Sequence, residues 1–157
     1  MSTLEIVLLL HIAAAIVFFA GLLLTVATNT AAVRRSDPAE ISVLLSLARI
    51  GALITAAGGI AVLAFGLSLV ELTGREPSET WLSASVALLI AAFALGALGG
   101  RNQRRARKLA AQAHGETAPP AEEIIKLLRN PLTRAANTLA TLASVAILVL
   151  MVWRPGG

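Results

Sequence analysis

Four apolar stretches constrain the fold of this chain more than any other feature. They cover about residues 6–27, 50–70, 81–100 and 135–153, and none contains Lys, Arg, Asp or Glu. A helix needs ~20 apolar residues to cross the ~30 Å hydrocarbon core of a bilayer. Only 14% of the 157 residues are charged, against roughly 25% in a soluble domain. We therefore expect an all-α polytopic membrane protein, a single transmembrane domain folded as a bundle of four transmembrane helices.

The basic residues predict which way the spans cross the membrane. Eleven of the 13 Lys and Arg residues lie in or beside two connections, at residues 30–49 and 101–134. Short loops rich in Lys and Arg stay in the cytoplasm, which is the positive-inside rule. Both termini are therefore predicted to lie outside, in an inner (plasma) membrane of the bacterial type.

Four side chains are predicted to anchor the ends of the spans. Arg49 and Arg134 stand near the feet of the second and fourth spans, where their side chains are expected to reach lipid phosphates. Trp81 and Trp153 fall at the opposite boundary, where an aromatic belt is expected. The lipid bilayer is thus the first expected partner. A membrane surface also explains the net charge of +4 better than a nucleic acid does, so we expect no nucleic-acid partner.

Each basic connection carries Pro-Ala-Glu, at residues 38–40 and 120–122, ahead of an amphipathic stretch. Asp37 is predicted to cap a helix that starts at the first of these prolines, with Glu40 completing a capping box, and Asn130 to cap the fourth span. The chain is therefore interpreted as two copies of a helix pair. The second amphipathic stretch is predicted to form a short helix whose apolar side lies on the membrane.

Small residues predict where the helices meet. Lipid is as apolar as Leu, so helices in lipid associate by close packing of small residues and by hydrogen bonds. The predicted packing positions are Gly51, Gly58, Gly59, Gly66, Gly96 and Gly100. The fourth span places Asn137, Thr141 and Ser144 on one face. No charge accompanies them, so we interpret this face as hydrogen bonding between helices, in preference to a polar cavity.

The composition excludes several kinds of site. The chain has no Cys, which removes disulfides, thiolate metal sites and iron–sulfur clusters, and it has no Tyr and only two His. It also lacks phosphate-loop, zinc-protease and serine-hydrolase motifs. No charged residue lies inside a span, which disfavours a transporter or channel. These absences favour a non-catalytic protein without a cofactor, acting as a scaffold, a self-associating protein or an accessory subunit of a larger complex.

His11 is the one ionisable side chain inside a span. At 100° per residue it shares a helix face with Ala14 and Phe18, and the small residues beside it leave room for a flat ligand. A neutral imidazole in an apolar bundle is a good ligand for haem iron; the alternative is a structural imidazole that hydrogen-bonds a neighbouring helix. Met151, near the outer end of the fourth span, is a weak second axial candidate. His114, in the second basic connection, is expected to be solvated.

Residues 10–21, which read LHIAAAIVFFAG, resemble the opening of the DUF2269-type predicted integral membrane proteins. More distantly they are similar to the CopD-like copper-resistance membrane domains and the HemJ-type protoporphyrinogen oxidases. The DUF2269 type fits best in length and in number of spans. In the HemJ-type relatives this His binds haem, so the resemblance implies His11 as an axial ligand, although the Lys of a later span in those proteins has no counterpart here. The leading interpretation is a non-catalytic membrane protein, and the alternative is a redox protein that binds b-type haem or porphyrin at His11.

Overall fold

A computed structural model describes residues 2–74, 79–112 and 120–153 of the protein. These residues form five helices and no strand: α1 (Thr3–Ala32), α2 (Pro38–Thr73), α3 (Thr80–Ala111), α4 (Ala121–Leu128) and α5 (Pro131–Trp153). The helices α1, α2, α3 and α5 are each long and apolar enough to cross a membrane. The prediction of an all-α protein with four spanning helices is confirmed.

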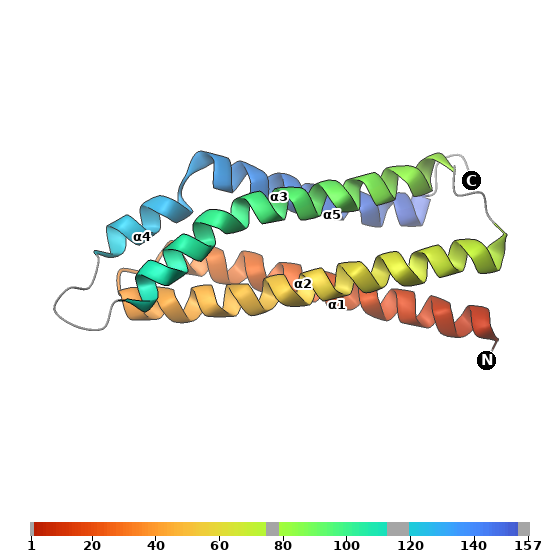
Figure 1. Cartoon of the computed structure of the whole chain (residues 1–157), viewed down its shortest axis with the longest axis horizontal. Helices are drawn as coiled ribbons and strands as arrows, with labels where there is room; N and C mark the ends of the chain where they lie inside the picture. The colour runs from red at the N-terminus through yellow and green to blue at the C-terminus, as the bar shows by residue number, and fades with distance from the viewer. Residues whose placement is uncertain (1, 75–78, 113–119, 154–157) are drawn as a thin grey trace.

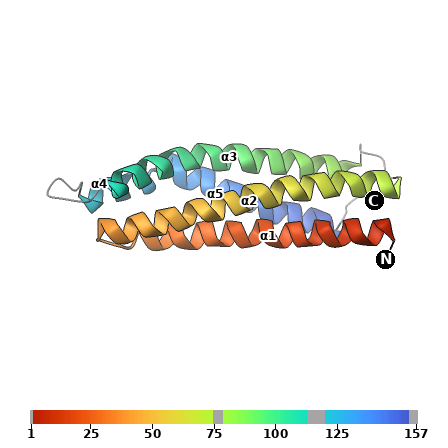
Figure 2. The ribbon, with the colours of Figure 1, turned by 60° about the horizontal axis from the view of Figure 1, so that its bottom comes forward.

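The four long helices are arranged as two hairpins (Figure 1). α1 packs along α2, α3 packs along α5, and the main contacts between the hairpins are those of α2 with α3. A second view shows the two hairpins side by side along the bundle (Figure 2). α1 begins at the end of the bundle where α5 finishes, and α4 lies at the opposite end.

Two of the helix starts follow from the local sequence. The Asp37 side chain accepts a hydrogen bond from a backbone N–H of the first turn of α2, at 2.9 Å, with Pro38 at the first helical position. Asn130 caps α5 in the same way, at 3.0 and 3.3 Å. Both predicted caps are confirmed. Glu40 does not complete the predicted capping box; its carboxylate pairs with Arg35 instead, at 3.5 Å.

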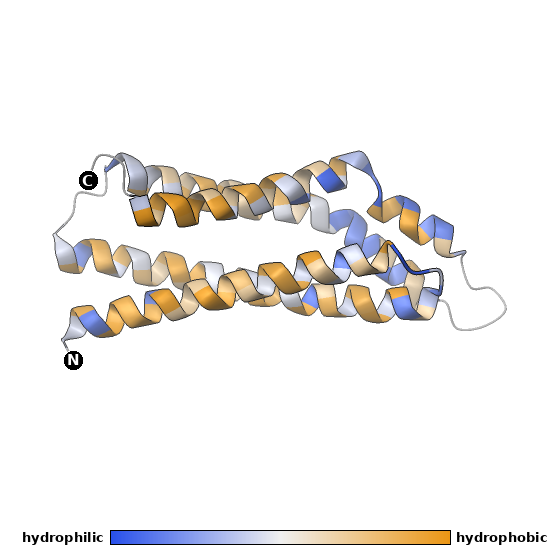
Figure 3. Ribbon diagram, turned by 180° about the vertical axis from the view of Figure 1, so that it is seen from behind, coloured by the Kyte–Doolittle hydropathy of each residue, from blue (hydrophilic) through white to orange (hydrophobic). Residues whose placement is uncertain are grey.

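The helices extend beyond the predicted spans. At 1.5 Å per residue, the 36 residues of α2 reach about 54 Å, against ~30 Å for the hydrocarbon core. The extra turns lie where connections were predicted: residues 38–49 and 101–111 continue α2 and α3 as helix. Hydropathy colouring shows polar residues gathered here and apolar residues along the rest of the bundle (Figure 3). We call this end, with α4 and the α1–α2 connection, the basic end.

The best-packed core lies at the basic end. Ile41 and Leu45 of α2 belong to one buried cluster with Ile124 and Leu128 of α4, and each is 6% exposed or less. The cluster also contains Ala32, Ala106 and Ala110. Both isoleucine–leucine pairs follow a Pro-Ala-Glu segment, so the repeated motif builds one shared core. The prediction that the apolar side of α4 lies on the membrane is wrong, because that side is covered by other helices of the protein and so is already removed from water.

The middle of the bundle buries much less. In the most apolar 18-residue window of each spanning helix, only 17–28% of the residues are buried within the protein. Ile16, Leu23, Ile60 and Ile90 are all more than 60% exposed. In a membrane such side chains face lipid, which is as apolar as they are. The middle therefore depends on close approach of helices at small residues more than on a thick core.

Candidate functional site

α1 and α2 approach each other through one glycine on each helix. A Cβ at Gly21 would lie 2.5 Å from the backbone nitrogen of Thr55, and a Cβ at Gly51 would lie 2.6 Å from Thr25 Oγ1. Each threonine hydroxyl donates to the carbonyl of the glycine four residues before it, at 2.9 Å. The two helices thus present the same Gly-x-x-x-Thr pair to one another. This contact sets the rotation of α1 and turns His11 toward α2.

Phe18 is held by the paired glycines of α2. Its backbone nitrogen lies 2.6 Å from the position of a Cβ on Gly58, and its ring carbon Cδ2 lies 3.2 Å from that of a Cβ on Gly59. Phe93 of α3 occupies the other side of Gly59. Phe18 is buried, and its ring meets that of Phe19 edge-on with centroids 5.2 Å apart. Gly59 therefore lies where α1, α2 and α3 meet.

His11 lies two turns before Phe18 on the same face of α1 and is half-buried. Gly66 of α2 makes room for the ring, since a Cβ there would lie 3.2 Å from Cε1 and 3.5 Å from Nδ1. Nδ1 is buried and makes no hydrogen bond to any residue that the structure describes. The backbone carbonyl of Val62 lies beside the ring, but not in hydrogen-bonding geometry with Nδ1. A buried polar atom without a partner is costly, which makes His11 the leading candidate site.

The imidazole opens onto a small cleft between the two hairpins. α2, α3 and α5 supply the other walls, which are almost entirely apolar and include Gly66, Ser85 and Met151. The cleft holds about 30 Å³, enough for water and far below the ~300–1,000 Å³ of a typical ligand pocket. The Ser85 hydroxyl already donates to the carbonyl of Trp81 in its own helix, at 2.7 Å. Among the residues that line the cleft, His11 is the only ionisable one.

An apolar cluster around Trp81 adjoins the cleft, because Leu82 and Met151 take part in both. Trp81 is buried, and its indole N–H donates to the Glu79 carboxylate at 2.6 Å. The sequence predicted Trp81 as an anchor at the membrane interface; α2 and α5 pack against it, and its anchoring role stays a prediction. Met151, named from the sequence as a weak axial candidate, does line the same cleft as His11.

The predicted glycine positions of α3 differ from those of α2. A Cβ at Gly96 would have nothing within 4 Å. A Cβ at Gly100 would have only the side chain of Arg104, one turn on in the same helix. Within the described residues, neither packs against another helix as predicted. Gly99 does so instead: a Cβ there would collide with the Asn137 side chain of α5. The close approach of α3 and α5 thus lies at Gly99, one residue before the predicted Gly100.

The polar face of α5 is satisfied mainly within its own helix. The Thr141 and Ser144 hydroxyls donate to carbonyls one turn back, at 3.0 and 2.9 Å. Among the described residues, the hydrogen bonds predicted from these two hydroxyls to other helices are therefore not formed. A hydrogen bond between α3 and α5 comes instead from Asn102 of α3, whose side-chain amide donates to the Thr133 hydroxyl of α5, at 2.7 Å.

The other predicted anchors lie on the surface. Arg49, Arg134 and Trp153 are all exposed, and their anchoring role stays a prediction. His114 lies outside the described residues, as does most of the connection between α3 and α4.

The model of a family described as predicted integral membrane proteins, DUF2269, matches residues 5–155. The chain belongs to the DUF2269 family. The resemblance seen in residues 10–21 is confirmed for this family, while the more distant one to the CopD-like and HemJ-type proteins stays a prediction. No curated protein and no solved structure matches the chain. The family and the four apolar helices together make this DUF2269 protein a multi-pass integral membrane protein.

Proposed function

We propose that this DUF2269 protein is a non-catalytic membrane protein that acts by association, as a scaffold, a self-associating protein or an accessory subunit. One observation carries the proposal: His11 is the only ionisable side chain lining the cleft between the hairpins. Acid–base and nucleophilic catalysis depend on groups that work together, such as a nucleophile and the base that activates it. The one hydroxyl on the cleft walls, that of Ser85, already donates to the carbonyl of Trp81, and the other lining residues are apolar. The fit of the ring against Gly66 supports a packing role for the imidazole.

We also propose that the basic end faces the cytoplasm of a bacterial-type cell and that both termini lie outside. The support is the positive-inside rule together with the gathering of polar residues at one end of the bundle (Figure 3). The connection between α2 and α3 then lies outside.

Cysteine labelling tests this orientation. A Ser36→Cys thiol should react with a membrane-impermeant reagent only after the membrane is opened, whereas a Thr80→Cys thiol should react in intact cells. Both positions are exposed, and the chain has no cysteine of its own, so each variant carries one reactive thiol. The reverse labelling pattern would overturn the orientation and leave the fold untouched.

A second candidate function is the binding of b-type haem or another porphyrin with His11 as axial ligand. Two observations favour it: His11 Nδ1 has no hydrogen-bond partner among the described residues, and Met151 lines the same cleft. His and Met together ligate haem in some cytochromes. The donor atom fits haem iron, but about 30 Å³ of space does not fit a macrocycle. The hairpins would have to separate, and Met151 would have to leave its contact with the Trp81 cluster.

An absorption spectrum separates the two functions. We expect protein purified in detergent, after expression with excess haem, to be colourless. We expect His11→Ala to cost less than about 1 kcal/mol of unfolding free energy, because hydrogen bonds between membrane helices average about 0.6 kcal/mol and Nδ1 makes none to the described residues. A Soret band that is lost in a folded His11→Ala variant would replace the leading function with the second one.

A further inference from the structure

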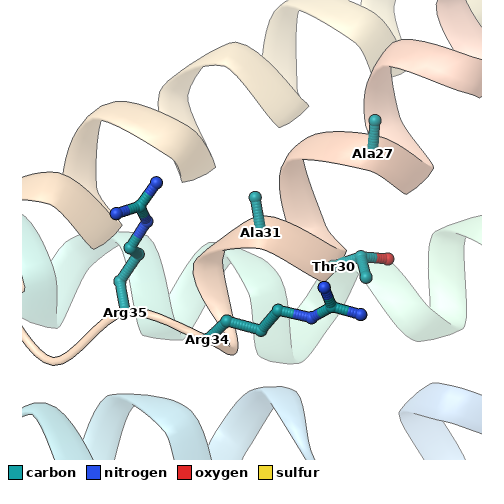
Figure 4. Close-up of a pocket in the computed structure, with 5 residues that line it drawn as sticks. All are labelled: Ala27, Thr30, Ala31, Arg34 and Arg35. Carbon is teal, nitrogen blue, oxygen red and sulfur yellow. The ribbon is translucent and has the colours of Figure 1, made fainter.

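We propose that a groove at the basic end of α1 binds the headgroup of an acidic phospholipid (Figure 4). The groove has a volume of about 510 Å³ and is lined by Ala27, Thr30, Ala31, Arg34 and Arg35. It lies at the opposite end of α1 from His11, so the proposal is independent of the function assigned to the cleft.

The two arginines of the groove differ in their availability. Arg35 pairs with Glu40 at 3.5 Å, and both side chains are more than half exposed. Arg34 is exposed and makes no ion pair with any residue in the described part of the chain. In Figure 4 the Arg34 side chain runs back along α1 toward Thr30. The Thr30 hydroxyl already donates to the carbonyl of Val26, at 2.8 Å, so it offers an acceptor to a lipid hydroxyl.

The depth of the groove fits a lipid better than a free anion. The apolar stretch of α1 ends near Ala27, and Ala31 and Arg34 follow about 6 and 10 Å further along the helix axis. The headgroup layer extends about 5–8 Å beyond the hydrocarbon core on each side. The two alanines therefore lie where acyl chains give way to the glycerol backbone, and the guanidinium, on a flexible side chain, reaches the phosphates.

The charge around the groove favours an acidic lipid over a zwitterionic one. The groove lies at the C-terminal end of α1, where the helix dipole alone repels an anion. The guanidinium of Arg34 must therefore supply the local attraction. Basic residues beside a membrane span attract acidic lipids in general. Further exposed ones lie on α3, on α4 and directly after α4: Arg101, Arg104, Arg105, Lys108, Lys126 and Arg129.

Native mass spectrometry of the full chain in detergent tests the proposal. Phosphatidylglycerol is expected to bind more tightly than phosphatidylcholine with the same acyl chains. Arg34→Gln should weaken phosphatidylglycerol binding about five-fold, the effect of one basic residue near an acidic membrane surface, and leave phosphatidylcholine binding unchanged. Arg105→Gln is the matched control, because Arg105 is also exposed at the basic end but lies outside the groove. It should weaken binding less than Arg34→Gln does.

Three results would overturn the proposal. Equal losses in the two variants, or no loss in Arg34→Gln, would mean that the basic end attracts acidic lipid without a site in the groove. Displacement of the lipid by millimolar inorganic phosphate would assign the groove to a free anion. The expected result is that phosphate does not displace it. Because Arg34 and Arg105 are exposed, both variants should melt like the parent protein, and the spectrum at His11 reports on the proposed function separately.

Discussion

Ile124→Ala is expected to lower the free energy of unfolding by about 2–5 kcal/mol, the range for large-to-alanine changes in a packed core. Ile124 is 0% exposed and belongs to the cluster at the basic end with Ile41 and Leu45 of α2. The cavity would lie among the helices that share this cluster, whose backbones cannot all move in to fill it. Thermal unfolding in detergent, followed by circular dichroism, measures the loss.

Ile90→Ala is the matched control for this experiment. It removes the same atoms, but Ile90 is 61% exposed in the membrane-spanning part of α3. Lipid or detergent takes the place of the missing atoms there, and both are as apolar as the side chain. We expect a change within about 0.5 kcal/mol, as at other surface positions. A loss in Ile124→Ala that is as small as the one expected for Ile90→Ala would mean that docking of α4 does not stabilise the bundle.

Gly58→Leu is expected to cost up to about 3 kcal/mol through overpacking. A Cβ at Gly58 would lie 2.6 Å from the backbone nitrogen of Phe18. Backbone atoms of α1 cannot rotate out of the way as a side chain can, so the first hairpin has to open. The midpoint of thermal unfolding in detergent is expected to fall, and a variant with an unchanged midpoint would show that α1 does not press on this face of α2.

Gly96→Leu separates overpacking from the other effects of adding a leucine. A Cβ at Gly96 meets nothing within 4 Å among the described residues, and Leu favours helix over Gly by roughly 0.5–1 kcal/mol. The variant should therefore be as stable as the parent protein or slightly more so. A loss equal to that of Gly58→Leu would point to a general effect of adding leucine, with no special contact at Gly58.

The parts of the fold that depend on short-range rules were predictable from the sequence. A long uncharged stretch in a membrane has to be helical, because no water is present to satisfy the backbone. The caps at Asp37 and Asn130 act within one turn, so the sequence beside each helix start was enough to find them. The choice of His11 as a candidate site rests likewise on one fact of the sequence, a single ionisable group within the spans.

The parts that depend on which surfaces meet were not predictable. In lipid the apolar pattern does not tell the inward face of a helix from the outward one. The pattern therefore does not single out Gly21, which packs against α2, and it predicts a contact at Gly96, which faces outward. The amphipathic pattern of α4 shows that one side must be covered, but the same pattern suits a membrane or a protein surface. Met151 lines the same cleft as His11 because of the way the two hairpins dock. No short stretch of sequence determines that docking.

The core at the basic end has a consequence for biogenesis. Ile41 and Leu45 belong to the first hairpin, whereas the residues of α3 and α4 that complete their cluster come from the second half of the chain. At roughly 5–20 residues per second, synthesis leaves these two side chains uncovered for several seconds after they are made. Exposed apolar surface of this kind is what chaperones and proteases act on. A chain that stops after α3 thus lacks Ile124 and Leu128, and the cluster at the basic end stays incomplete.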